Sequence, residues 1–268
     1  MARTRRTALI TGASAGIGRE FARVFAAQGF DLALVARSED KLQQLAQELG
    51  PAHAVSVTVI PQDLTLGDAA QRVFDEVQRA GIKVDVLVNN AGISFVEAFA
   101  DTPLDQHLRL LQLNVMALTA LTWLFVDPMI ERGWGRIINL ASVAAFQPTP
   151  SLALYGASKA FVLSLSEALT EELRGTGVTV TAVCPGFTDT PMVRNALADR
   201  DSLFEIPSFL LLDPAGVAAE GYRAAMQGKA IQVNGLPYRL FEQWMKLQPR
   251  WLTRTLGGLI GRLALSEY

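Results

Sequence analysis

The most constraining feature of this sequence is a regular alternation of short β-rich runs with longer segments of helical periodicity. The β-rich runs cover residues 8–10, 31–36, 54–60, 84–89, 135–140 and 178–183, and a shorter run follows at 230–233. Such alternation is typical of a parallel sheet with right-handed crossovers and with helices on both faces. We therefore predict an α/β fold with a doubly wound parallel sheet of about seven strands.

The alternation continues without a linker, an internal repeat or a low-complexity segment, so we predict a single domain over residues 1–268. Half of the residues are hydrophobic, which is enough for one large core. The formal net charge of -2 provides no overall positive field, and we expect no nucleic-acid partner.

The cysteine content and the first residues bear on the cellular compartment. Cys184 is the only cysteine, which excludes an internal disulfide and a metal site built from cysteines, and is typical of a reducing compartment. The apolar run at 8–10 is too short for a signal peptide or a membrane span. We predict a cytoplasmic protein that binds no metal.

Small and polar residues follow six of the predicted strands. In chain order they are Thr11–Gly18 (TGASAGIG), Arg37, Asp63, Asn89–Gly92 (NNAG), Ser142 and Pro185–Gly186. Each of them could be an ordinary turn residue. In an open parallel sheet, however, ligands bind beyond the carboxyl ends of the strands, so six such ends together predict one binding site at that edge.

The first of these turns carries three glycines, Gly12, Gly16 and Gly18, between a strand and the start of a helix. Glycine permits a tight turn and a close approach of the backbone to a pyrophosphate, whose charge then meets the helix N-terminus. The spacing G-x-x-x-G-x-G differs from the commoner G-x-G-x-x-G. An ordinary strand-to-helix turn is therefore an alternative interpretation of the loop.

The end of the second strand bears on the choice of cofactor. An acidic residue there usually binds the ribose 2′-hydroxyl of NAD, whereas an arginine accommodates the 2′-phosphate of NADP. Here Ala36 stands at the expected acidic position and Arg37 follows it. A guanidinium matches a phosphate in charge and geometry, so we predict NADP rather than NAD. The alternative is that Arg37 is a solvated charge beside Glu39 and Asp40.

Tyr155 and Lys159 stand four residues apart, which places both side chains on one face of a helix. A free tyrosine has a pKa near ~10, too high for a base at neutral pH. An ammonium about 4 Å away favours the phenolate and would lower that pKa. The pair therefore predicts a proton donor and acceptor. A chance contact on the protein surface is the alternative.

Together, TGASAGIG, NNAG, Asn114, Ser142, YGASK and the late PG resemble the classical short-chain dehydrogenase/reductase family over about residues 5–235. The resemblance implies a Rossmann-like fold and a catalytic tetrad of Asn114, Ser142, Tyr155 and Lys159. In this tetrad Tyr155 would be the general acid or base, and Ser142 would hydrogen-bond the substrate oxygen. Lys159 would hold the nicotinamide ribose and lower the tyrosine pKa, and Asn114 would support a proton-relay water.

The same resemblance implies a wider set of cofactor contacts. They are Gly12, Ser14, Gly16, Ile17, Gly18, Arg37, Asp63, Asn90, Ala91, Gly92, Tyr155, Lys159, Pro185, Gly186, Thr188 and Thr190. Asp63 would meet the adenine, and the segment from Pro185 to Thr190 would contact the nicotinamide end. The family gives Cys184 no role, and neither His53 nor His107 has the spacing of a metal ligand or a catalytic triad.

Residues 187–212 would form a mobile lid by the same resemblance, and they contain a strongly apolar run. Further apolar residues lie near predicted strand ends, at Phe95, Val96, Phe99, Phe146 and Leu152. They predict an apolar pocket and a hydrophobic ketone, aldehyde, steroid-like or acyl substrate. Alternatively, several of them belong to the core.

The last residues, about 236–268, differ from the common family ending, because two amphipathic segments follow the last strand. From Lys229 onward, six basic residues stand against two acidic ones. A basic amphipathic helix can lie on a membrane surface. We favour a helical extension packed on its own subunit or on a partner. The resemblance implies a homodimer or homotetramer built through helices at about 103–127 and 151–175.

These observations predict an NADP(H)-dependent oxidoreductase that transfers a hydride between the nicotinamide and a small-molecule carbonyl or secondary alcohol. The alternative from another class is a non-catalytic NADP(H)-binding sensor or scaffold with the same fold. Loss of Tyr155 or Lys159 would mark that alternative, and both residues are present.

Overall fold

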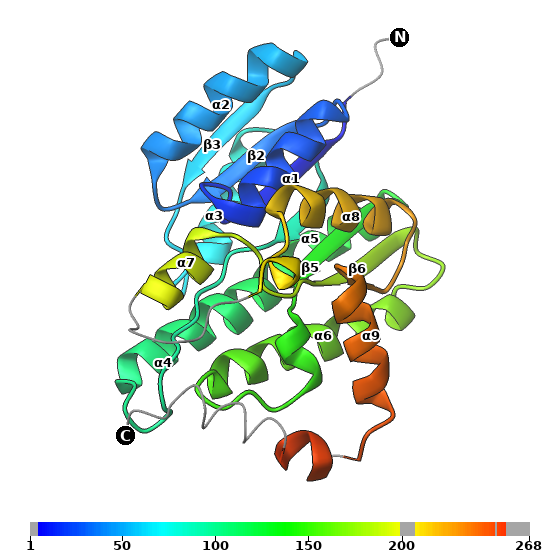
Figure 1. The fold of residues 1–268 in the computed structure, drawn as a ribbon. Coiled ribbons are helices and arrows are strands. Elements are labelled where there is room, and N and C mark those ends of the chain that lie inside the picture. The colour runs from blue at the N-terminus through cyan, green and yellow to red at the C-terminus, as the bar shows by residue number, and fades with distance from the viewer. Residues whose placement is uncertain (1–4, 199–206, 250, 256–268) are drawn as a thin grey trace.

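The computed structural model describes residues 5–198, 207–249 and 251–255. Seven parallel strands form one sheet in the order β3-β2-β1-β4-β5-β6-β7 (Figure 1). They are β1 (Thr7–Thr11), β2 (Asp31–Ala36), β3 (Val57–Pro61), β4 (Val84–Asn89), β5 (Gly135–Leu140), β6 (Val178–Cys184) and β7 (Ile231–Val233). The predicted doubly wound parallel sheet is therefore confirmed. The strand order reverses between β1 and β4, which is where such sheets bind ligands.

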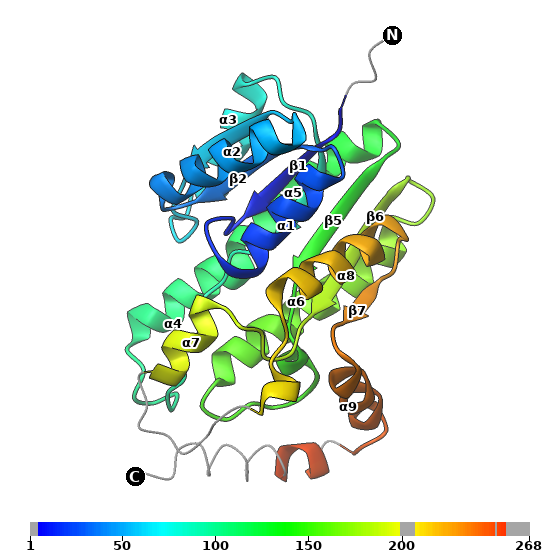
Figure 2. The same cartoon turned by 45° about the horizontal axis from the view of Figure 1, so that its top comes forward.

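Helices cover both faces of the sheet (Figures 1 and 2). One face carries α1 (Gly16–Ala27), α2 (Glu39–His53) and α8 (Pro214–Met226). The other carries α3 (Ala69–Arg79), α5 (Leu118–Glu131) and α6 (Ala153–Glu172), while α4 (Leu104–Leu111) packs on α6. The remaining helices are α7 (Pro191–Ala198), α9 (Leu236–Lys246) and two 3-10 turns, η2 (Val143–Phe146) and η3 (Ser208–Leu210).

The strands are buried on both faces because helices cover each side. In β1, for example, Leu9 packs in the core under α3 and α5, and the next residue, Ile10, packs in the core under α1 and α8. Successive side chains of a strand point to opposite faces, so a strand covered on both sides is apolar throughout. This rule explains why the β-rich runs read as continuous hydrophobic stretches.

A long apolar helix runs from Leu104 to Glu131 through α4, a six-residue π-helical segment η1 (Gln112–Ala117) and α5. Its length and mean hydropathy would allow it to cross a membrane. Leu121, Phe125 and Met129, however, are buried against the sheet and α3. The helix thus supplies much of the core on its face of the sheet.

The predicted lid and tail are described in part. The segment after β6 contains α7 and η3, and residues 199–206, which hold Phe204 and Ile206, lie outside the described residues. In the predicted tail, α9 is followed by a short helical turn at residues 251–255, and residues 256–268 lie outside the described part. Figure 2 shows α9 following β7 at the carboxyl edge of the sheet.

Candidate active site

A cleft of about 280 Å³ opens at the carboxyl ends of the strands. Its walls come from the turns after β1 to β4, from β5 and α6, and from the segment after β6. Of the predicted site residues, those that line it are Gly12, Ser14, Gly16, Ile17, Arg37, Asp63, Asn90, Ala91, Gly92, Tyr155, Lys159, Pro185 and Thr190. The fold thus brings residues separated by more than 170 positions to one cavity. Gly18, Asn114, Ser142, Gly186 and Thr188 are not among the residues that line it.

The glycine loop between β1 and α1 is held against the turn after β4. Gly12 has a φ of +66°, and a Cβ there would lie 2.7 Å from Nδ2 of Asn90. A Cβ on Gly18 would lie 2.4 Å from the same atom and 2.4 Å from the carbonyl oxygen of Gly12. Asn90 itself donates from Nδ2 to the carbonyl oxygen of Thr11 at 2.8 Å. Gly18 therefore permits the close packing behind the loop, while Gly12 exposes backbone to the cleft.

Thr11 connects the two turns, and the sequence analysis did not single it out. Its Oγ1 accepts hydrogen bonds from the amides of Asn90 and Ala91, both at 3.0 Å, and donates to the carbonyl oxygen of Val88 at 3.2 Å. One buried hydroxyl thereby satisfies two amides of the NNAG turn. The only sequence signal was a polar residue at the end of an apolar strand.

Arg37 and Asp63 line the far end of the cleft, after β2 and β3. Arg37 is exposed, and no hydrogen bond or ion pair engages its guanidinium within the part of the chain that the structure describes; Ala36 before it is buried. Burial opposes ionisation of Asp63, but hydrogen bonds from the amide and hydroxyl of Thr65 and the positive charge of Arg37 outweigh it and lower the pKa of the carboxyl. This end of the cleft thus pairs a cation with an ionised acid.

Asn114 lies in the π-helical segment, and its side chain is fully buried. Its Oδ1 accepts from the amide of Ile93 at 2.9 Å, and its Nδ2 donates to the carbonyl oxygen of Ile93 at 3.0 Å and to Oγ of Ser158 at 3.3 Å. Ser158 in turn donates to the carbonyl oxygen of Tyr155 at 2.7 Å. Asn114 therefore ties the chain after β4 to the helix that carries Tyr155, and π-helical segments often mark such functional positions.

The first turns of α6 place Tyr155 and Lys159 in the cleft wall. Lys159 Nζ lies 5.6 Å from the centre of the Tyr155 ring and donates to the carbonyl oxygen of Leu140 at 2.6 Å. Gly156 between them packs so tightly that a Cβ would lie 2.1 Å from Oγ1 of Thr149. Ser142, at the end of β5, caps η2 by accepting from the amide of Ala144 at 3.1 Å.

The net pKa shift of Tyr155 differs from the sequence prediction. Burial raises the pKa of the phenol, and the Ser142 side chain beside it acts in the opposite direction. Lys159 was expected to lower this pKa, but its own burial lowers the pKa of its ammonium to about 8. Lys159 therefore carries less charge at mildly alkaline pH, and its Nζ is engaged by Leu140 rather than by the phenol.

The turn after β6 contributes Pro185 and Thr190 to the cleft, but not Thr188. Thr188 is buried, and its Oγ1 donates to the carbonyl oxygen of Gly186 at 3.0 Å. Thr188 was predicted to contact the cofactor. In the structure its hydroxyl braces the turn, and the residue is not among those that line the cleft.

Comparison with known proteins places this architecture in a family. The family model for short chain dehydrogenase matches residues 6–201. The chain belongs to the short-chain dehydrogenase/reductase family. This assignment confirms the resemblance deduced from TGASAGIG, NNAG and YGASK, and it makes the chain an oxidoreductase.

Individual relatives are 30–38% identical to this chain, and the two solved structures cover about nine-tenths of it. The very-long-chain 3-oxoacyl-CoA reductase of Anas platyrhynchos is 38% identical over 191 residues, which cover 69% of this chain and 60% of that protein. A short-chain dehydrogenase from Sphingobium yanoikuyae, solved in complex with NADPH, is 31% identical with a TM-score of 0.79, covering 90% of this chain and 94% of that chain. The bulky-bulky ketone specific alcohol dehydrogenase from Comamonas testosteroni is 30% identical with a TM-score of 0.77, covering 91% and 93%.

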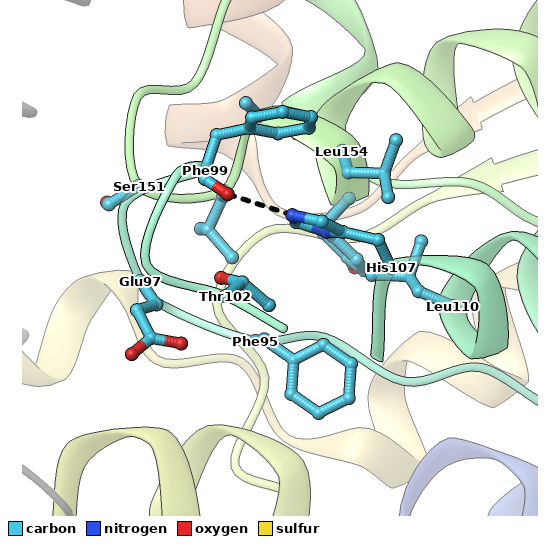
Figure 3. Close-up of a pocket in the computed structure, with 11 residues that line it drawn as sticks. Phe95, Glu97, Phe99, Thr102, His107, Leu110, Ser151 and Leu154 are labelled. Atoms are coloured by element: carbon cyan, nitrogen blue, oxygen red, sulfur yellow. Dashed lines mark hydrogen bonds between the residues drawn. The ribbon is translucent and has the colours of Figure 1, made fainter. Parts of the chain in front are cut away.

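A second, smaller pocket is shown in Figure 3. Tyr155 lines both this pocket and the cleft. His107 and Phe99 stack with ring centroids 4.5 Å apart, and the imidazole Nε2 lies 3.0 Å from the carbonyl oxygen of Phe99. That oxygen can only accept, so Nε2 carries a proton. Phe95 points away from His107 in Figure 3. Of the predicted apolar residues, Phe95, Phe99 and Leu152 line this pocket, and Phe146 packs against the core beside α6.

Cys184 lies fully buried at the end of β6, and burial raises the pKa of its thiol to about 12. A thiol in this state is a small hydrophobic side chain rather than a nucleophile. Among the described residues, no group of histidine, cysteine, aspartate and glutamate side chains could hold a metal ion.

Proposed function

We propose that this chain is an NADP(H)-dependent carbonyl reductase in which Tyr155 donates a proton to the carbonyl oxygen of a hydrophobic substrate. The observation that carries the proposal is the placement of Tyr155. It lines both the large cleft and the smaller pocket beside it, and it neighbours Ser142 and the buried Lys159. A group at this junction can contact the reacting atoms of a cofactor and of a substrate together.

The cleft fits a phosphorylated dinucleotide. Gly12 and Gly16, both with positive φ, expose backbone at the start of α1, where a pyrophosphate is favoured. Arg37 at the far end would meet a 2′-phosphate, and buried Ala36 offers no carboxylate to repel it. The NADPH complex of the Sphingobium yanoikuyae relative supports this choice. We therefore place the adenosine end at Arg37 and the nicotinamide end at Tyr155.

Three side chains would share the chemistry. When bound, NADPH supplies the hydride that reduces the carbonyl carbon. Ser142 would donate a hydrogen bond to the carbonyl oxygen, while Tyr155 gives its proton to the same oxygen as negative charge develops there. Lys159 would stabilise the tyrosinate that remains and bind the ribose hydroxyls beside it.

The raised pKa of Tyr155 favours reduction as the working direction. At neutral pH the phenol carries its proton, which is the form needed to donate to an alkoxide. Oxidation of an alcohol needs the phenolate and would be favoured at alkaline pH. Asn114 holds the chain after β4 against α6. It would thereby keep α6 in position and support the water that relays the proton.

We place the body of the substrate beside Tyr155, where the smaller pocket has a volume of about 10 Å³ in this structure and would have to widen. A carbonyl at Tyr155 directs the adjoining substituent toward Phe95, Phe99 and Leu152. The relatives that act on very-long-chain 3-oxoacyl-CoA and on bulky-bulky ketones support a large apolar substrate. We propose a ketone with at least one extended apolar substituent.

Self-association through the long helices is part of the proposal. Exposed apolar side chains gather on them: Leu108 on α4, Met116 and Trp123 along η1 and α5, and Phe161 on α6, with Trp123 70% exposed. An exposed apolar face of this kind fits a second copy of the chain, and it supports a homodimer or homotetramer. With Cys184 as the only cysteine in the sequence, we place the protein in the cytoplasm.

The test is oxidation of NADPH with a panel of apolar ketones and aldehydes, using wild type, Tyr155→Phe and the control Tyr222→Phe. Tyr222 packs against Phe25 with ring centroids 5.1 Å apart, away from the cleft. We expect Tyr155→Phe to lower turnover about 1,000-fold and Tyr222→Phe to leave it unchanged. If NADPH binds but no carbonyl turns over, the sensor or scaffold function replaces this proposal.

A further inference from the structure

The ring of Tyr238, on α9, lies directly on the turn after β6. A Cβ on Gly186 would lie 2.1 Å from the Cε2 and Cζ atoms of that ring. Tyr238 is buried, with 7% of its surface exposed. Gly186 is therefore required here because a larger residue would displace the tyrosine of a helix 50 residues further along the chain.

The phenol of Tyr238 bridges the two ends of the predicted lid. Its oxygen accepts a hydrogen bond from the amide of Phe187 at 3.1 Å, and its hydroxyl donates to the carbonyl oxygen of Leu210 at 2.7 Å. Phe187 begins the predicted lid, and Leu210 lies two residues before its end. One buried side chain outside the segment thus satisfies a backbone donor and a backbone acceptor at its base.

The base of the lid is also closed by its own backbone. Thr188 and Leu212 form a parallel bridge, in which the amide of Leu212 donates to Phe187 at 2.8 Å and the amide of Asp189 donates to Leu212 at 2.9 Å. A Cβ on Gly235, just before α9, would lie 2.9 Å from Leu212 Cδ2. The start of α9 therefore packs on this bridge.

α9 is fixed to the sheet independently of Tyr238. Arg239 donates to the carbonyl oxygen of Val233 at 2.9 Å and forms an ion pair with Glu220 of α8 at 2.9 Å. Asn234 donates to the same carboxylate at 3.1 Å. These contacts hold the helix in place when the phenol is changed, so the effect of the phenol on the lid can be tested separately.

We propose that Tyr238 is a positioning residue that sets the nicotinamide end of the cleft by clamping the base of the segment after β6. Pro185 and Thr190 line the cleft on either side of the clamped residues. Loosening the clamp therefore moves groups at that end, while Arg37 at the far end stays in place. Thr190 also packs on the glycine loop, where a Cβ on Gly16 would lie 3.1 Å from its Cγ2, so any effect on the loop passes through this one contact. The inference rests on the proposed function only for which end of the cleft receives the nicotinamide.

The test compares wild type with Tyr238→Phe, which keeps the ring on Gly186 and removes both hydrogen bonds of the phenol. Two ligands are titrated by fluorescence: NADPH, and 2′-phospho-ADP-ribose, which lacks the nicotinamide. We expect the Kd of NADPH to rise about 3- to 10-fold, the size of one or two lost hydrogen bonds, and the Kd of the fragment to stay within about 2-fold. Amide exchange at Asp189 and Leu212 in the ligand-free protein should accelerate about 10-fold.

Tyr222→Phe is the matched control, since it removes a phenol oxygen from a ring on α8 that packs against Phe25. Gly186→Ala should reproduce the change in the Kd ratio, because its Cβ cannot fit beneath the ring. An unchanged ratio in Tyr238→Phe overturns the proposal, and so does an equal rise in both Kd values. Failure of the proposed function leaves this test intact, because neither the Kd ratio nor the exchange rates depend on turnover, and NADH with ADP-ribose can replace the two ligands.

Discussion

The two sides of the cleft are built in different ways. Along the side formed by β1 to β4, site residues such as Gly12, Arg37 and Asp63 stand in turns that directly follow a strand. Along the other side, Tyr155, Lys159 and Tyr238 come from helices and act through partners distant in sequence. We call these the turn-built side and the helix-built side.

The difference shows which properties depend on local backbone and which depend on packing. A phosphate is met by amides and by a helix terminus, so the turn-built side needs small residues at fixed spacing. Proton transfer needs a shifted pKa, so the helix-built side needs burial. We therefore expect substitutions on the turn-built side to weaken binding, and those on the helix-built side to affect turnover and stability in opposite directions.

The largest effect is expected for Lys159→Met, on the helix-built side. Loss of the ammonium should lower kcat about 1,000-fold. The variant should also be more stable than wild type at pH 7, because the pKa of the buried lysine falls from 10.5 to about 8. That shift corresponds to a cost of up to about 3 kcal/mol for burying the charged form. Thermal unfolding at pH 7 measures the gain.

The pH dependence provides the control for Lys159→Met. Above pH 8 the native lysine loses its proton, whereas the unfolded chain keeps its own up to about 10.5. The unfolded state then binds more protons, so wild-type stability rises with pH in this interval. The stability gap between variant and wild type should therefore narrow between pH 8 and 10.5. A gap that is constant with pH would show that Lys159 is not buried as a charge.

On the turn-built side the largest effect is expected for Gly18→Ala. The new Cβ would lie 2.4 Å from the carbonyl oxygen of Gly12, a backbone atom that cannot rotate away. We expect about 100-fold weaker NADPH binding and a loss of about 1–3 kcal/mol in stability. Gly67→Ala is the matched control, because nothing lies within 4 Å of its Cβ position. Equal behaviour of the two variants in a fluorescence titration would break the comparison.

Arg37→Ala sharpens the comparison, since it removes one charge at the edge of the turn-built side. We expect NADPH to bind about 10- to 50-fold more weakly and NADH to bind as before. The titration of both nucleotides measures the ratio directly, and turnover at saturating NADPH should be unchanged. Equal binding of NADPH and NADH by wild type would disprove the role of Arg37.

The smallest effect is expected on the outer face of α9, where Leu240 is 59% and Trp244 is 42% exposed. The variant Leu240→Ser with Trp244→Ser should keep its stability within about 0.5 kcal/mol and its NADPH Kd unchanged, in contrast to changes at buried Tyr238. Sedimentation with anionic vesicles examines the same face. We expect the wild type to stay in the supernatant, and pelleting that depends on these two residues would assign the face to a membrane surface.

The turn-built side could be predicted from sequence because each residue stands at a fixed distance from a strand end. The alternation of β-rich runs with helical segments predicts a parallel sheet. One edge of that sheet is then expected to hold Gly12, Arg37, Asp63 and Asn90. The role of Thr11 was missed although it ends β1, directly before Gly12. Its role depends on two amides of another turn, and no pattern within β1 indicates that contact.

On the helix-built side, spacing predicted only one pair of residues, and the family resemblance supplied the rest of the catalytic tetrad. The Tyr155 and Lys159 pair shares a helix face and was found by spacing. The upward pKa shift of Tyr155 was not predicted, because burial is a property of the packed fold. Tyr238 carried no signal at all, since its partners lie 28 and 51 residues away in sequence. Contacts of that kind become visible only in three dimensions.

The measurement that tests the central claim most directly is transfer of deuterium from NADPH labelled at both C4 positions. Wild-type protein is incubated with an apolar ketone, and the alcohol is analysed by mass spectrometry, with Tyr155→Phe in parallel. Hydride transfer with Tyr155 as proton donor predicts one deuterium on the carbinol carbon from wild type and about 1,000-fold less labelled alcohol from the variant. Labelled alcohol formed equally by both proteins, or no label in the product from wild type across the panel, would contradict it.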